Sequence, residues 1–155
     1  MSVIIQGDQV RAISLGILVE KAAAVTADGD IELFVVSGGS VLLVGFYGDV
    51  ETALPANTDL DIDFAPADGG TDVVLATTLV ADSDPTGTLY TLNGTAGGIL
   101  IETLDIAHNA ILESPIVLTE GTIFITKGGG GSAGGSIRWY CIYVPVDDGA
   151  SVAAA

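Results

Sequence analysis

Hydrophobic and polar residues alternate along most of this chain, so that apolar side chains recur at every second position. Residues 58–65 (Thr-Asp-Leu-Asp-Ile-Asp-Phe-Ala) alternate strictly, and a strand would place their aspartates on one face and Leu60, Ile62 and Phe64 on the other. Alternating or β-branched stretches of the same kind predict further strands at residues 11–19, 30–36, 40–47, 71–80, 114–119, 121–127 and 136–145. Turn residues recur about every 8–12 positions, which is the spacing of an all-β sandwich or barrel.

Two segments add local detail to this all-β prediction. Asn93-Gly94 lies between two apolar runs, and both residues tolerate a positive φ, which predicts a β-hairpin. Residues 102–113 fit both a helical spacing and the continuation of a strand, and we interpret them as a strand with a bulge or a short helical turn. Residues 20–25 have a helical texture but form only a short segment.

A glycine-rich tract at residues 128–135 decides whether the chain contains one domain or two. About 19 residues follow this tract, which is too few for a second domain. They include the strand at 136–145, and the nearest partner for that strand is the one at 121–127. The tract is therefore predicted to be a long hairpin tip, which either extends into solvent or packs against a neighbouring chain, where glycine allows close approach of backbones.

The patterns together predict one domain over residues 1–155. We expect an antiparallel, jelly-roll-like β-sandwich with the glycine-rich hairpin tip near its C-terminal end. An N-terminal arm at residues 1–10 and a C-terminal tail at residues 150–155 are expected to flank it.

Composition limits the classes of protein to which the chain can belong. Its mean hydropathy is high, at +0.61. The apolar runs are nevertheless short and are broken by Gly, Asp, Asn or Pro, whereas a membrane-spanning helix needs about 20 apolar residues. No secretory signal is recognisable at the start of the sequence. The single cysteine, Cys141, cannot form an intrachain disulfide.

The charge balance argues against proteins that bind nucleic acid or anionic membranes. The chain contains four Lys and Arg residues and 20 Asp and Glu residues, which gives a net charge of −16. Such a surface repels nucleic acid and anionic lipid, because binding to phosphate needs clustered cations. We therefore expect no nucleic-acid or membrane partner and interpret most of the acidity as a device for solubility.

No cluster of residues indicates catalysis or a cofactor. His108 is the only histidine, and it accompanies neither a nucleophile-elbow motif nor a cysteine-centred one. Cys141 is expected to be a buried, inert thiol. Lys127 precedes the glycines and a strand follows them, whereas a phosphate-binding P-loop needs Gly-Lys-Ser/Thr before a helix. We expect no enzyme activity, no catalytic residues and no cofactor.

Asp59, Asp61 and Asp63 resemble a comb of metal ligands. A calcium loop of the EF-hand type needs glycine at its sixth position and a carboxylate at its twelfth, but Phe64 and Gly70 stand there. We therefore interpret the three carboxylates as the solvated face of a strand and predict no metal site. An occasional Ca²⁺ site shared with the pairs Asp28 and Asp30 or Asp82 and Asp84 stays open.

The last predicted strand carries the strongest signal for an interface. Trp139 and Tyr140 are adjacent and therefore face opposite ways in a strand, so one enters the core while the other faces out. Arg138 shares the face of Tyr140, and Arg and Tyr are enriched at interfaces. The candidate interface residues are Arg138, Tyr140, Lys127 and Arg11.

The C-terminal part of the chain resembles a known group of proteins. It runs Glu-Gly-Thr-Ile-Phe-Ile-Thr-Lys-Gly, then the glycine tract, then Ser-Ile-Arg-Trp-Tyr-Cys-Ile-Tyr-Val-Pro-Val-Asp-Asp-Gly-Ala-Ser-Val-Ala-Ala-Ala. It resembles the C-terminal ends of small β-rich proteins that decorate or cement the heads of tailed bacteriophages. The glycine tract is longer here than in that pattern.

The resemblance implies a function without catalysis. The chain would be a structural protein on the outer surface of the phage head, bound to the major capsid protein or to other virion proteins. It would be a homo-oligomer, with a trimer as the first expectation. The alternative is a tail, fibre or head-spike module that binds a host glycan.

Overall fold

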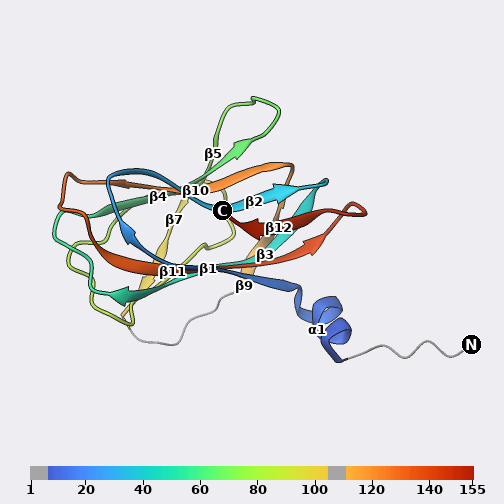
Figure 1. Cartoon of the computed structure of the whole chain (residues 1–155), viewed down its shortest axis with the longest axis horizontal. Coiled ribbons are helices and arrows are strands. Elements are labelled where there is room, and N and C mark those ends of the chain that lie inside the picture. Colours follow the sequence, from blue (N-terminus) through green and yellow to red (C-terminus); the bar gives the residue numbers. More distant parts are fainter. Residues whose placement is uncertain (1–6, 105–110) are drawn as a thin grey trace, which may run out of the picture.

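The computed structural model describes residues 7–104 and 111–155, which form a nearly all-β structure of two six-stranded sheets (Figure 1). The strands of sheet A lie in the order β1 (Ile17–Thr26), β11 (Gly134–Pro145), β3 (Val41–Thr52), β6 (Leu89–Thr91) and β8 (Ile101–Thr103), with β9 (Ile111–Leu118) also paired to β3. Those of sheet B lie in the order β12 (Ser151–Ala154), β2 (Gly29–Ser37), β10 (Gly121–Gly128), β4 (Asp59–Pro66), β5 (Val73–Val80) and β7 (Gly98–Ile99).

All pairings are antiparallel except the short parallel contact of β5 with β7. Consecutive strands change sheets repeatedly, because β1 and β3 lie in sheet A while β2 and β4 lie in sheet B. The prediction of an all-β fold is confirmed, and the predicted strands at 30–36, 40–47, 58–65 and 71–80 correspond to β2, β3, β4 and β5. No helix among the described residues is both long and apolar enough to span a bilayer.

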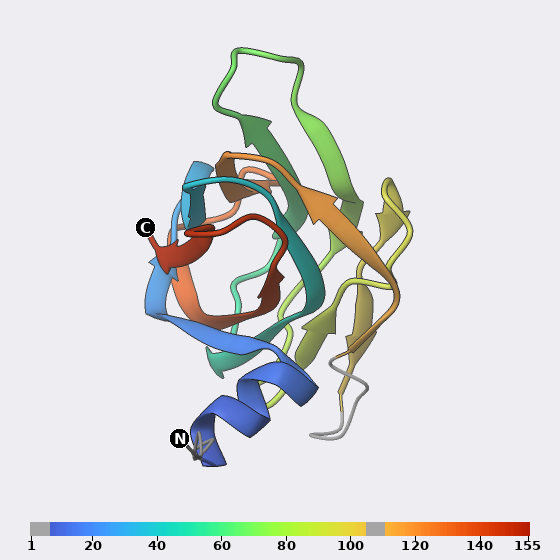
Figure 2. The ribbon, with the colours of Figure 1, turned by 90° about the vertical axis from the view of Figure 1, so that its right-hand side faces the viewer.

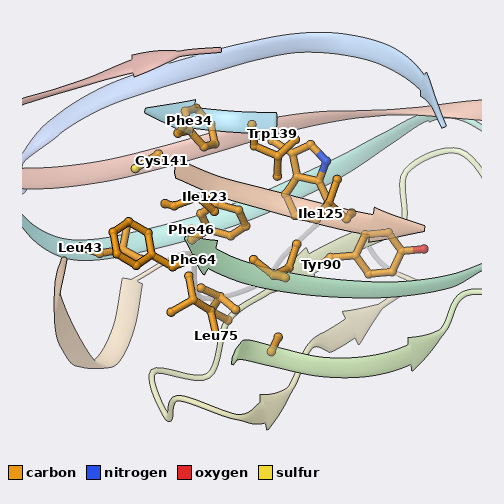
Figure 3. Packing of buried hydrophobic residues seen from close by; sticks show 14 of the residues in the cluster. Phe34, Leu43, Phe46, Phe64, Leu75, Tyr90, Ile123, Ile125, Trp139 and Cys141 are labelled. Carbon is orange, nitrogen blue, oxygen red and sulfur yellow. The ribbon is translucent and has the colours of Figure 1, made fainter. Parts of the chain in front are cut away.

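The core lies between the two sheets and is built by the alternation that the sequence displays. Along β11, Ile137, Trp139, Cys141 and Tyr143 are buried, whereas the residues between them are partly exposed. The Phe46 ring contacts both Phe34 of the other sheet and Trp139, with ring centroids 5.9 and 5.3 Å away (Figure 3). Aromatic contacts of this kind between sheets add to the free energy gained by burial.

The N-terminal region differs from its prediction. Residues 11–15 belong to a helix, α1 (Gly7–Leu15), and the first strand begins only at Ile17. The helix ends at Gly16, whose φ of 86° suits glycine and whose N–H donates to the Ala12 carbonyl oxygen at 3.1 Å. Figure 2 shows α1 outside the two sheets, beside β1. Of the expected N-terminal arm, residues 1–6 lie outside the described residues.

The prediction of a glycine-rich hairpin tip is wrong. β10 and β11, which flank the tract, lie in different sheets, so the connection 129–133 crosses from one sheet to the other. The tract also packs against its own chain, since the Gly131 N–H donates to the Asn57 carbonyl oxygen at 3.2 Å. A Cβ atom on Gly129 would lie 2.2 Å from that same oxygen. The glycines are there because two backbone segments touch.

The C-terminal residues are not a free tail. Residues 151–154 form β12, which pairs with β2 at the edge of sheet B, with Val152 opposite Val36. The Val152 side chain is buried. The small alanine side chains suit a short edge strand, which also lies near β1.

The two remaining local predictions concern the hairpin at Asn93-Gly94 and the ambiguous segment 102–113. β6 and β8, on either side of Asn93-Gly94, do pair antiparallel, but residues 92–100 connect them instead of a two-residue turn. In that connection, Asn93 Oδ1 accepts a hydrogen bond from the Thr95 N–H at 2.8 Å. Part of the ambiguous segment 102–113 lies outside the described residues, and its ends belong to β8 and β9.

Candidate functional site

The outer face of sheet A is the candidate site, and it is formed by alternate residues of three neighbouring strands. Tyr140 lies opposite Tyr47 of β3 on one side and opposite Glu20 of β1 on the other, so all three side chains point away from the core. We call this surface the sheet A face and define it by Leu18, Glu20, Tyr47, Asp49, Glu51, Arg138, Tyr140 and Ile142.

Two tyrosines occupy the centre of the sheet A face. The rings of Tyr47 and Tyr140 stack with their centroids 4.5 Å apart and 15° between their planes. Partial burial raises the pKa of Tyr47, and the neighbouring Tyr140 and Glu20 raise it further. Burial and Glu20 also raise the pKa of Tyr140. Both hydroxyl groups therefore stay neutral near pH 7 and can donate hydrogen bonds at the edge of an apolar surface.

Arg138 links the three strands of the sheet A face. Its Nε donates to Glu51 Oε1 of β3 at 2.5 Å, and its Nη1 donates to Glu20 Oε1 of β1. Hydrogen bonds to Glu51 and Glu20 raise the pKa of Arg138. Two carboxylates thus neutralise the guanidinium, and its side chain is only 33% exposed. Arg138 and Tyr140 share one face as expected. Arg138 is paired, however, with one carboxylate on each neighbouring strand.

Lys127 does not lie on this face. Its side chain is fully buried (0% exposed), and Nζ lies 2.5 Å from Asp28 Oδ1 and 3.3 Å from the Gly131 carbonyl oxygen. Along β10, Ile123, Ile125 and Lys127 share the inward face, because residues two apart in a strand point the same way. The prediction of Lys127 as an interface residue is wrong, and the alternation Ile-x-Ile-x-Lys in the sequence could have indicated its burial.

Arg11 lies in α1 and borders an open groove beside the sheet A face. The α1 groove, as we call it, has a volume of about 550 Å³ and is mainly apolar. Its lining comes from the helix, from the start of β1 and from the two central strands: Arg11, Ala12, Leu15, Gly16, Ile17, Leu18, Tyr47 and Ile142. Leu15 and Leu18 are 64% and 56% exposed. The groove could not be predicted from a single strand at residues 11–19, because it is formed by a helix that ends at Leu15 and a strand that begins at Ile17.

The outer face of sheet B has the opposite character. Asp59, Asp61 and Asp63 do share one face of β4, as predicted, while the residues between them are buried. Burial raises the pKa of Asp63, and Asp61, Asp72 and Asp30 raise it further. In the described part of the chain, no three Asp, Glu, His or Cys side chains are grouped so that they could hold a metal ion.

The two residues considered for nucleophilic chemistry give no active site. Cys141 is buried, and burial raises the pKa of its thiol to about 12, which keeps it in the unreactive protonated form. His108 lies outside the described residues. Comparisons of the chain with protein-family models, with curated proteins and with solved structures found no match.

Proposed function

We propose that this chain is a non-enzymatic structural protein of a tailed-phage virion that decorates or cements the head by binding neighbouring capsid subunits. The observation that carries the proposal is the sheet A face, where the stacked tyrosines lie between Leu18 and Ile142 on one side and, on the other, an arginine paired with two carboxylates of its own chain. Aromatic and apolar side chains with few unpaired charges are typical of the centre of a protein–protein interface. The likeness of the C-terminal segment to head-decoration proteins supports the same assignment.

The strand order supports a jelly roll as the finer description of the fold. Four strands of sheet A lie in the order β1, β11, β3 and β9, and four strands of sheet B lie in the order β2, β10, β4 and β5. An eight-stranded double sheet whose chain passes repeatedly between the layers is the jelly-roll arrangement found in viral capsid and lectin domains. The fold alone does not fix the function, so the proposal rests on the surface.

The distribution of charge supports one orientation on the shell. The outer face of sheet B carries the aspartates of β4 together with Asp30 and Glu32 of β2. The sheet A face would contact the capsid subunits, because its arginine is paired and its centre is aromatic. The acidic sheet B would then face solvent, away from the packaged DNA that it repels. Neighbouring subunits bridged in this way are stabilised because the protein binds the assembled lattice.

Mass spectrometry of purified particles tests the proposal. We expect the chain in virions at a copy number comparable with that of the capsid subunits, and release from the particles should lower their resistance to heat. Absence from particles, or only a few copies in each, would refute a decorating role.

The alternative is a tail, fibre or head-spike module that binds a host glycan. The partly exposed rings of Tyr47 and Tyr140 favour it, as does the use of jelly rolls in lectins. A glycan array separates the two functions: a specific glycan signal that Tyr140→Ala abolishes would support the alternative, and an array without signals would count against it.

A further inference from the structure

We propose that residues 1–6 of one copy of this chain bind in the α1 groove of a second copy. The contact would join identical chains before or during their attachment to a larger assembly. It goes beyond the proposed function, because it concerns a contact between two copies of the chain; the groove shares Leu18, Tyr47 and Ile142 with the sheet A face, so the bound segment would adjoin whatever that face binds.

The α1 groove leaves apolar side chains in water. Leu15, Ile17 and Leu18 are 64%, 36% and 56% exposed, and they surround one continuous groove with Ile142 and Tyr47. Each large apolar side chain removed from water contributes roughly 1.5–3 kcal/mol when burial is complete. A segment that fills the groove therefore gains free energy from several side chains at once.

The helix that forms one wall of the groove needs support. α1 has nine residues, and isolated helices shorter than about 12 residues are marginal in water. Val10 and Leu15 of α1 are 49% and 64% exposed, so the chain's own sandwich covers them incompletely. A second molecule in the groove would bury Leu15 further and stabilise the helix.

Charge identifies which segment of a second copy can enter. Two copies of a chain with a net charge of −16 repel each other, so a contact between them is favoured where it uses a stretch without carboxylates. Residues 1–7 contain no charged side chain and include the apolar run Val3-Ile4-Ile5. The other segment outside the described residues, 105–110, contains Asp105 and no run of three large apolar residues. Residues 1–6 are thus the segment whose chemistry suits the groove.

The position of α1 leaves the groove accessible to a neighbour. The helix lies outside the sandwich, with its C-terminal end at β1 (Figures 1 and 2). Nine helical residues span about 13 Å, so Gly7 lies about that far along the helix axis from the junction with β1. A donor segment of one copy in the acceptor groove of the next makes a head-to-tail contact, which closes into a ring when the rotation between copies allows it. A trimer of this kind would be such a ring.

Light scattering after size exclusion tests the contact with three proteins. They are the unaltered chain, a variant lacking residues 2–6, and Leu18→Asp, which places a carboxylate in the groove at an exposed position. We expect the unaltered chain, which has a mass of 15.6 kDa, to be an oligomer and each variant to have the mass of its single chain at the same concentration. A 1:1 mixture of the two variants should form a dimer, because one retains the segment and the other retains the groove.

Two controls keep the result interpretable. Val80→Asp changes an apolar side chain on β5 that is 61% exposed and lies outside the groove, and it should leave the oligomer intact. Leu15→Asp repeats the groove test on the helix if Leu18→Asp fails to fold, which circular dichroism would reveal. A monomeric unaltered chain, an oligomer that survives loss of residues 2–6, or a mixture that stays monomeric would each overturn the inference. None of these results bears on whether the chain is present in virions.

Discussion

Tyr47 and Tyr140 lie opposite each other on β3 and β11, and their rings stack at 4.5 Å on the outer side of sheet A. Opposite positions on antiparallel strands bring side chains of one face together, and an aromatic pair there contributes about 0.5–1.5 kcal/mol beyond burial. The pair stabilises its own sheet, yet its edges remain available to a partner.

Replacing Tyr140 by alanine should therefore weaken partner binding as well as folding. We expect the free energy of unfolding to fall by at least about 1 kcal/mol, because the variant loses the aromatic pair and the partial burial of the ring. Binding to capsids stripped of the protein should fall at least tenfold under conditions in which the variant remains folded. Co-sedimentation with stripped capsids and urea unfolding measure the two effects. Val80→Ala, an exposed apolar position on sheet B, is the matched control and should leave binding unchanged.

The glycine tract offers a comparison between two neighbouring positions. Gly129 and Gly130 both have a positive φ, of 90° and 70°, but only a Cβ on Gly129 would collide with the backbone of residue 57. Gly130→Ala should cost about 1–2 kcal/mol, since alanine disfavours this conformation. Gly129→Ala should cost clearly more, because the β3–β4 connection must also move. Equal unfolding free energies for the two variants would show that the tract does not pack against the connection.

The buried ion pair gives an asymmetric prediction. Lys127 is fully buried, whereas the Asp28 side chain is 54% exposed. Asp28→Ala leaves a buried ammonium without its carboxylate and should destabilise the fold by about 3 kcal/mol. Lys127→Met removes the buried charge and keeps an apolar chain of similar length, so its cost should be below about 1 kcal/mol.

Chemical denaturation of both variants measures this difference. Asp148→Ala removes one negative charge at an exposed position and serves as the control for net charge. A larger loss of stability in Lys127→Met than in Asp28→Ala would contradict the pairing of Lys127 with Asp28.

The strands could be predicted from the sequence because their alternation is strict. In residues 58–65 every second side chain is apolar, and β4 buries Leu60, Ile62 and Phe64 as that pattern requires. Pairing could not be predicted in the same way, because a hairpin and a crossing between sheets can share the same flanking strands. The glycines at 129 and 131 indicate close contact with another backbone segment, but that this segment is the one around Asn57 could not be predicted from the sequence.

The candidate site was predicted only in part. Tyr140 and Arg138 follow from the alternation around Trp139, whereas Tyr47 joins them only through the register of β3 with β11, which depends on contacts distant in sequence. The burial of Lys127 follows from its spacing from Ile123 and Ile125, although a charged side chain is usually exposed. The α1 groove depends on a helix in residues whose apolar spacing also fits a strand.

The acidic face of sheet B should make stability depend on pH through Asp63. Burial, Asp61, Asp72 and Asp30 raise the pKa of Asp63 above its usual 3.8 in the folded protein. The folded state therefore binds this proton more tightly than the unfolded state does. The contribution of Asp63 to stability is greatest below pH 3.8 and is lost as the pH rises through the folded pKa. Asp63→Asn removes the charge, so it should stabilise the protein at pH 7, and its advantage should shrink as the pH falls to about 4. Urea unfolding of the variant and the unaltered chain across this range measures the effect, and Asp148→Asn is the control for net charge. An advantage that is constant with pH would show that the pKa of Asp63 is not raised in the folded protein.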